Sequence, residues 1–122
     1  MIPDIWGPHV WKSMHLIAAG YPVKPTKQDM KVYKCHFVNM GNVLPCKRCG
    51  LNYKKHLVKY PIDNYLKSRK RLMYWVYLIH KEVNKITGKS SKVLWSDVYA
   101  KYMKLIYISN SASKLKNAKN IK

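Results

Sequence analysis

The sequence predicts an all-α protein, an antiparallel four-helix bundle with a short fifth helix. Apolar residues recur three and four positions apart along four long segments, which is the period of an amphipathic helix. Glycine and proline residues punctuate the intervals between these segments. No segment shows the alternation of apolar and polar residues that is typical of a half-buried strand. At 122 residues the chain forms one domain, and short loops between four helices favour an antiparallel arrangement.

The first two helices are separated by a break that is rich in glycine and proline. Asp4 can cap the first helix, because a carboxylate at that position accepts hydrogen bonds from free backbone N–H groups. The stretch GYPVKPT, residues 20–26, interrupts the helical pattern. Thr26 opens the second helix, which we expect to run to about Asn39 and to end at Gly41.

The third and fourth helices follow the same logic. Pro45 is predicted to start the third helix, which runs through about Val58. The fourth helix is the longest, from about Leu66 to Thr87, and Gly88 closes it. Residues 97–108 predict the short fifth helix. We therefore expect a folded domain over residues 1–108, followed by a basic, flexible tail over residues 109–122.

The net charge of +19 arises from 24 lysine and arginine residues against five acidic ones. Such a charge suggests a nucleic-acid partner. However, 21 of the basic residues are lysine, only three are arginine, and they are spread along the whole chain. A bias toward A- and T-rich codons explains this surplus, so we favour a solvated lysine-covered surface. A small basic helical protein that binds nucleic acid or another protein remains the alternative function.

Composition also predicts where the protein works. Three cysteines do not resemble the disulfide framework of a secreted protein. The N-terminal stretch MIPDIWGPHVWKSMHL lacks the pattern of a signal peptide. No stretch is long and apolar enough to span a membrane. We therefore expect an intracellular protein with no membrane partner.

Cys46 and Cys49 are spaced C-x-x-C, which is compatible with half of a zinc site, a structural disulfide or a redox pair. Structural zinc needs four ligands, and no second pair with suitable spacing exists, so we predict no metal site. Stable disulfides are uncommon in intracellular proteins. A redox pair fits better: Cys46 falls in the first helical turn, where the helix dipole with Lys47 and Arg48 favours thiolate.

Histidines and tryptophans form faces on two other helices. His80 and Asn84 are four residues apart and share a face, as do Trp11 and His15. Two such faces beside the C-x-x-C helix would suit a flat aromatic cofactor. On spacing alone, the interpretation as a core or boundary residue is favoured for any one of these side chains.

Three motifs, in this order along the chain, decide between a cofactor site and ordinary core residues. They are W-G-x-x-x-W-x-x-x-H from Trp6, P-C-x-x-C from Pro45 and H-x-x-V-N-x-x-x-G-K from His80. Together they resemble the Erv/ALR family of FAD-linked sulfhydryl oxidases, over about Ile5 to Trp95. The resemblance implies a four-helix bundle that holds FAD non-covalently at one end, often as a homodimer.

The resemblance also assigns roles to individual residues. It implies that Cys46 receives electrons from a dithiol of a substrate protein or a thioredoxin-like carrier. Cys49 is then the sulfur next to the flavin, and oxygen is the final acceptor, giving hydrogen peroxide. The residues that the resemblance places against FAD are Trp6, Gly7, Trp11, His15, Cys49, His80, Val83, Asn84, Lys85, Lys89 and Trp95.

The sequence departs from the family pattern in two places. Lys81 stands where the family has an asparagine, and Tyr77 stands where many relatives have a cysteine. No separate shuttle C-x-x-C is present. The chain therefore resembles the minimal members from large DNA viruses, for which the host cytoplasm or the virion is the expected location.

Two features stay outside this assignment. Cys35 is expected to be a buried or half-buried thiol, or to form a disulfide across a dimer. The stretch GKSSK is no phosphate-binding loop, because that motif needs glycine where Val83 stands. A family-like bundle that serves only as an interaction scaffold is a further alternative.

Overall fold

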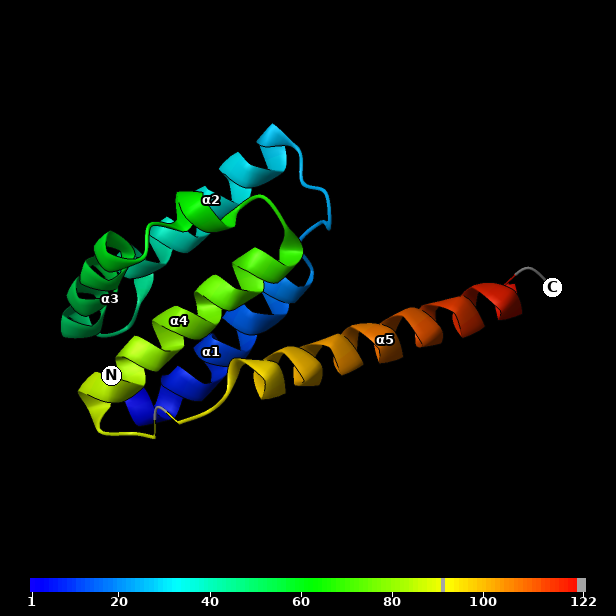
Figure 1. Cartoon of the computed structure of the whole chain (residues 1–122). Coiled ribbons are helices and arrows are strands. Elements are labelled where there is room, and N and C mark those ends of the chain that lie inside the picture. The colour runs from blue at the N-terminus through cyan, green and yellow to red at the C-terminus, as the bar shows by residue number, and fades with distance from the viewer. Residues whose placement is uncertain (91, 121–122) are drawn as a thin grey trace.

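The computed structural model describes the backbone of residues 1–90 and 92–120 and confirms the all-α prediction. Within these residues there is no strand. The helices are α1 (Pro3–Ala19), α2 (Lys27–Val43), α3 (Lys47–Lys59), the 3-10 turn η1 (Ile62–Tyr65), α4 (Arg69–Thr87) and α5 (Trp95–Asn120). α1 packs along α4, α2 packs against α3, and α5 leaves the bundle at an angle (Figure 1).

The starts of the first two helices differ in how they are capped. α1 is preceded by Ile2, which makes no side-chain cap, so the prediction of Asp4 as the cap is wrong. Asp4 lies in the first turn, where its charge complements the helix dipole. Thr26 caps α2 as predicted, and its hydroxyl accepts from the backbone N–H of Asp29, whose carboxylate accepts from the backbone N–H of Thr26.

α2 continues past Gly41 to Val43, four residues beyond the predicted end. The physical reason is the close packing of α2 against α3. The backbones are so close that a Cβ atom added at the buried Gly50 would clash with the carbonyl oxygen of Gly41. The two glycines thus let the two helices approach closely, and this packing offsets the weak helix propensity of Gly41. The C-x-x-C segment is therefore held against the end of α2.

α3 begins two residues later than predicted, at Lys47 rather than at Pro45. Cys46 is its N-cap rather than a residue of its first turn, and the backbone N–H of Cys49 donates to the sulfur of Cys46 at 3.3 Å. α4 also starts late, after Ser68, which accepts from the backbone N–H of Arg71. Gly88 closes α4 in the left-handed conformation, as predicted.

α5 is 26 residues long, so the prediction of a short fifth helix over residues 97–108 is wrong. After Trp95 the chain contains no glycine or proline that would end a helix. In Figure 1 the second half of α5 projects beyond the other helices. The flexibility of residues 109–122 stays a prediction, and residues 121–122 lie outside the described residues.

Aromatic side chains fill the core of the bundle. Trp75 on α4 is fully buried, packs edge-on against Phe37 of α2, and donates its indole N–H to the carbonyl of Tyr60. The hydroxyl of Tyr53 donates to the carbonyl of Phe37, which ties α3 to α2. Burial of these large rings fixes the helices that surround the site. In the part of the chain that the structure describes, no helix is long and apolar enough to cross a membrane.

Candidate functional site

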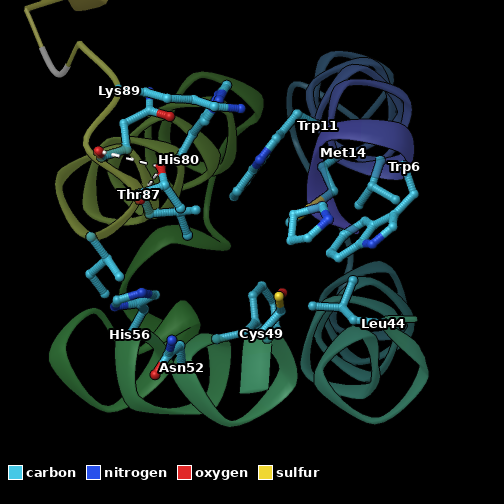
Figure 2. A pocket seen from close by; sticks show the side chains of 16 residues that line it. Trp6, Trp11, Met14, Leu44, Cys49, Asn52, His56, His80, Thr87 and Lys89 are labelled. Atoms are coloured by element: carbon cyan, nitrogen blue, oxygen red, sulfur yellow. Dashed lines mark hydrogen bonds between the residues drawn. The ribbon is translucent and has the colours of Figure 1, made fainter. Parts of the chain in front are cut away.

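A cavity of about 140 Å³ lies between α1, α3 and α4, next to the start of α3. Figure 2 shows side chains from these helices pointing into the shared space. The lining comprises Pro3, Trp6, Val10, Trp11, Met14, Leu44, Cys49, Asn52, Tyr53, His56, His80, Val83, Asn84, Ile86, Thr87 and Lys89. Most of this surface is apolar or aromatic, with a few polar groups among it, which is the usual character of a cofactor pocket.

Cys46 and Cys49 form a disulfide, with their Cα atoms 5.2 Å apart. The two sulfur-bearing side chains face different spaces. Cys49 lines the cavity, whereas Cys46 lines a separate groove on the outer surface between α2 and α3. The disulfide therefore connects the outer surface with the interior of the cavity.

Trp11 and His80 close one side of the cavity. Their rings are stacked, with centroids 4.1 Å apart and planes 7° from parallel. Behind them, Nε2 of His15 lies 3.0 Å from Nδ1 of His80, so one of these two nitrogens donates to the other. The predicted i, i+4 faces on the first and fourth helices are therefore one contiguous cluster.

Both histidines of this cluster resist protonation. Burial, followed by the charges of His80 and Lys101, lowers the pKa of His15 to about 3. Burial, followed by the charge of Lys89, lowers the pKa of His80 to about 4. Both rings are therefore neutral near pH 7, so the N–H of one ring can donate to the unprotonated nitrogen of the other.

His56 is a cavity residue that the sequence reasoning missed. Its side chain is buried, and its Nε2 has no hydrogen-bond partner among the residues that the structure describes. Burial lowers its pKa, partly offset by the charge of Glu82. Helical spacing could have found it, because Asn52, Tyr53 and His56 lie three, four and seven residues after Cys49 and share its face.

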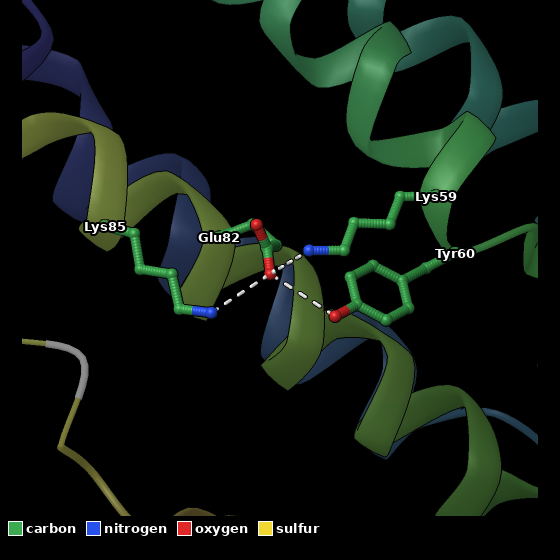
Figure 3. Close-up of polar contacts among 4 residues, drawn as sticks. All are labelled: Lys59, Tyr60, Glu82 and Lys85. Carbon is green, nitrogen blue, oxygen red and sulfur yellow. Dashed lines mark hydrogen bonds and ion pairs between the residues drawn. The ribbon is translucent and has the colours of Figure 1, made fainter.

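The structure brings seven of the predicted cofactor residues into this cavity: Trp6, Trp11, Cys49, His80, Val83, Asn84 and Lys89. Gly7 and His15 do not line it, although both are buried and His15 contacts His80. Lys85 points to another face of α4, where it meets the carboxylate of Glu82 together with Lys59 (Figure 3).

Trp95 also lies away from the cavity, in an aromatic cluster with Tyr74, Tyr77 and Tyr99. Tyr77 donates its hydroxyl to the carbonyl of Val93 and so ties the loop after α4 to that helix. Cofactor roles for Gly7, His15, Lys85 and Trp95 stay predictions.

Cys35 is exposed on α2 and forms no disulfide within the part of the chain that the structure describes, so the expectation of a buried or half-buried thiol is wrong. A disulfide across a dimer stays a prediction. Its neighbour Phe37 occupies the buried side of the helix instead. Within the described residues, no group of three or more histidine, cysteine and acidic side chains could hold a metal ion.

Comparisons with known proteins agree with this geometry. A mimivirus protein (Acanthamoeba polyphaga mimivirus), named a probable FAD-linked sulfhydryl oxidase, is 44% identical over 73% of this chain and 63% of its own length. The FAD-linked sulfhydryl oxidase of African swine fever virus is 28% identical, over 75% of both chains. The chain thus spans less than two thirds of the mimivirus protein.

Solved structures show the same fold. The FAD-binding domain of Erv1 from Saccharomyces cerevisiae superposes with a TM-score of 0.71 and 27% identity, covering 76% of this chain and 87% of that domain. The yeast Erv1 core gives a TM-score of 0.69 with 26% identity, covering 75% of each chain. Residues 8–103 match the profile of the Erv1 / Alr family. This chain belongs to the Erv1 / Alr family.

Proposed function

We propose that the chain is an FAD-linked sulfhydryl oxidase that makes disulfides in a thiol-containing protein. One observation carries the proposal: the Cys46–Cys49 disulfide has one cysteine on an outer groove and the other in the cavity. A disulfide placed in this way can accept electrons from outside and deliver them inside. The names of the mimivirus and swine fever virus relatives support the same activity.

The cavity residues fit FAD. Stacked Trp11 and His80 offer flat aromatic surface, and the unpartnered Nε2 of buried His56 offers a hydrogen-bonding group. Lys89 provides a positive charge for phosphate. We propose that FAD is held by Trp6, Trp11, Cys49, His80, Val83, Asn84 and Lys89, with Gly7, His15, Lys85 and Trp95 contributing as the family resemblance implies.

The protein's own residues perform the thiol chemistry. A substrate thiolate attacks the sulfur of Cys46, the Cys46–Cys49 bond breaks, and its electron pair leaves as the Cys49 thiolate. A second substrate thiolate then attacks the mixed disulfide, releasing the oxidised substrate and the Cys46 thiolate. The Cys49 N–H, which points at the Cys46 sulfur, stabilises that thiolate. FAD, when bound, would take up the electron pair from the reduced pair and pass it to oxygen, giving hydrogen peroxide.

Replacement of the cavity cysteine tests this function. Cys49→Ser should abolish oxygen consumption with dithiothreitol while the protein keeps the visible absorption of bound flavin, because only the electron path is cut. Cys35→Ser is the matched control and should retain full activity, since Cys35 lies on another helix and forms no disulfide. Oxygen uptake by Cys49→Ser at the wild-type rate would contradict the assignment, as would a chain that binds no FAD.

The same proposal includes the electron donor, the electron acceptor and the oligomeric state. We propose a thiol protein or a thioredoxin-like carrier as the electron donor, oxygen as the acceptor, and a homodimer as the working form. The relatives in mimivirus and African swine fever virus support a viral origin. We propose action in the host cytoplasm or the virion.

A further inference from the structure

We propose that the outer groove at Cys46 docks an acidic dithiol segment of the partner protein; this inference rests on the proposed function. The Cys46 groove, about 240 Å³ in volume, lies between the end of α2 and the first two turns of α3. Residues that matter for docking in its lining are Gly41, Asn42, Cys46, Lys47, Leu51 and Lys54. It is distinct from the cavity that Cys49 lines, and Leu44 lies between them as a residue of both linings.

The position of Cys46 makes this groove the entrance for substrate. A substrate thiolate that enters it reaches the sulfur of Cys46, and a new S–S bond forms while the Cys46–Cys49 bond breaks. The electron pair then leaves on Cys49, which lines the cavity on the other side. The second substrate thiolate attacks the first substrate sulfur, and the Cys46 thiolate departs. Both substrate sulfurs must therefore lie within the groove in turn.

The charge around the groove is positive. Lys47 and Lys54 line it, and Arg48 and Lys55 are exposed on the same two turns of α3. None of these four takes part in the ion pairs of the described residues, which are Lys34–Asp63, Lys59–Glu82, Lys85–Glu82 and Lys89–Asp4. No acidic residue lines the groove. A segment with carboxylates beside its cysteines would therefore be attracted, and a basic one repelled.

An exposed apolar side chain in the lining is a second feature of the groove. Leu51 lies in the groove with 61% of its surface exposed, one residue after the buried Gly50 contact with α2. An exposed leucine beside a redox sulfur offers hydrophobic contact to a bound peptide. Nucleic acid would satisfy the lysines but would bring no thiol to Cys46. The combination of positive charge, an exposed leucine and the disulfide sulfur favours an acidic thiol protein as the occupant.

Two synthetic dithiol peptides test the inference on the flavin-loaded full chain. They share the same cysteine pair and differ only in flanking residues, acidic in one and lysine in the other. The acidic peptide should be oxidised with a kcat/KM about tenfold higher at low salt. The difference should shrink as the salt approaches about 1 M, because exposed charges are then screened. Dithiothreitol serves as the uncharged reference substrate.

A matched pair of variants locates the effect. Lys54→Glu should lower kcat/KM for the acidic peptide about three- to tenfold through KM, and change dithiothreitol oxidation by a clearly smaller factor, because dithiothreitol carries no carboxylate. Lys55→Glu makes the same charge change one residue away, but Lys55 does not line the groove. It should have a clearly smaller effect. Flavin absorbance and the melting temperature of each variant verify that it is folded.

Each outcome separates the two proposals. If the wild type does not oxidise dithiothreitol, the proposed function is overturned and this inference with it. If dithiothreitol is oxidised but the two peptides react equally, or the two variants behave alike, the groove inference alone is overturned. A second copy of the chain in the groove would appear as a changed sedimentation coefficient of Lys54→Glu with unchanged peptide kinetics, and would also overturn it.

Discussion

Among single residues, the buried histidines are the groups whose protonation the fold opposes most clearly. His15 is only 7% exposed and stacks on Tyr102, with Lys101 nearby, and its pKa is lowered to about 3. His80 is held against it, with its own pKa lowered to about 4. A proton on either ring would lie beside a second positive charge in a poorly hydrated place. The pair is therefore stable only while neutral.

This cluster predicts a pH dependence of stability. The folded pKa of each histidine is below the unfolded value near 6.5, so the unfolded chain takes up protons first as the pH falls. Stability is then full above about pH 6.5 and is lost below it, by about 2 kcal/mol at pH 5 from His15 alone. Urea unfolding of the apoprotein at about pH 7 and about pH 5 measures this change.

Two variants check the source of that dependence. His15→Gln should lower stability at neutral pH but flatten the slope between the two pH values, because one titrating group is removed. His36→Gln changes an exposed histidine and should keep the wild-type slope. Equal slopes for all three proteins would show that the buried cluster does not cause the pH dependence.

Individual residues of the site can be predicted from the sequence only where helical spacing or a motif identifies them. The motifs identified Trp11, His80 and Cys49, which the structure brings to one cavity. His56 was missed because no motif includes it, although its seven-residue spacing from Cys49 carried the information. Trp95 packs into a tyrosine cluster instead, because the path of the loop after α4 decides its place and a sequence pattern does not.

Between elements, one carboxylate ties α3 to α4 beside the cavity. Glu82 is 12% exposed, and its Oε1 lies 3.0 Å from Nζ of Lys59, 3.3 Å from the hydroxyl of Tyr60 and 3.4 Å from Nζ of Lys85 (Figure 3). Desolvation raises the pKa of Glu82, but the two lysines together outweigh it, so the pKa lies below its usual value. Glu82 is next to Val83, which lines the cavity.

This contact predicts a measurable contribution to stability. Glu82→Gln should lower the free energy of unfolding by about 1 kcal/mol at neutral pH, because it removes charge-assisted hydrogen bonds to a largely buried oxygen. Asp63→Asn is the control, since its pair with Lys34 is exposed on both sides and should cost less than about 0.5 kcal/mol. Urea unfolding of both variants gives the comparison, and equal losses would contradict the special role of Glu82.

Helix ends were less predictable than helix positions, for two physical reasons. Gly41 signals a stop in sequence, yet tertiary contact with Gly50 carries α2 to Val43. After residue 108 the composition is polar and basic, which suggests a tail. The structure describes helix as far as Asn120, because lysine, serine, alanine and asparagine keep adequate helix propensity, while the flexibility of residues 109–122 stays a prediction. Gly88 was predictable because only its left-handed conformation closes α4.

The whole molecule leaves apolar surface uncovered. Leu16 on α1 and Val32 and Val38 on α2 are each at least 40% exposed. Val32 and Val38 lie on the same face of α2 as Cys35, opposite the buried Phe37. Such a face on a small chain with a high net charge is a surface through which two copies could associate symmetrically.

The proposed homodimer predicts a sedimentation-equilibrium mass of twice 14.4 kDa. The mass should persist at moderate salt, because apolar contact between copies is not screened, whereas repulsion between two copies of charge +19 is reduced. Cys35→Ser should keep that mass, since association through apolar surface needs no covalent link. Non-reducing electrophoresis of the wild type reveals any disulfide at Cys35. A mass of 14.4 kDa at all protein concentrations would contradict the dimer, and the exposed valines would then be ordinary surface residues.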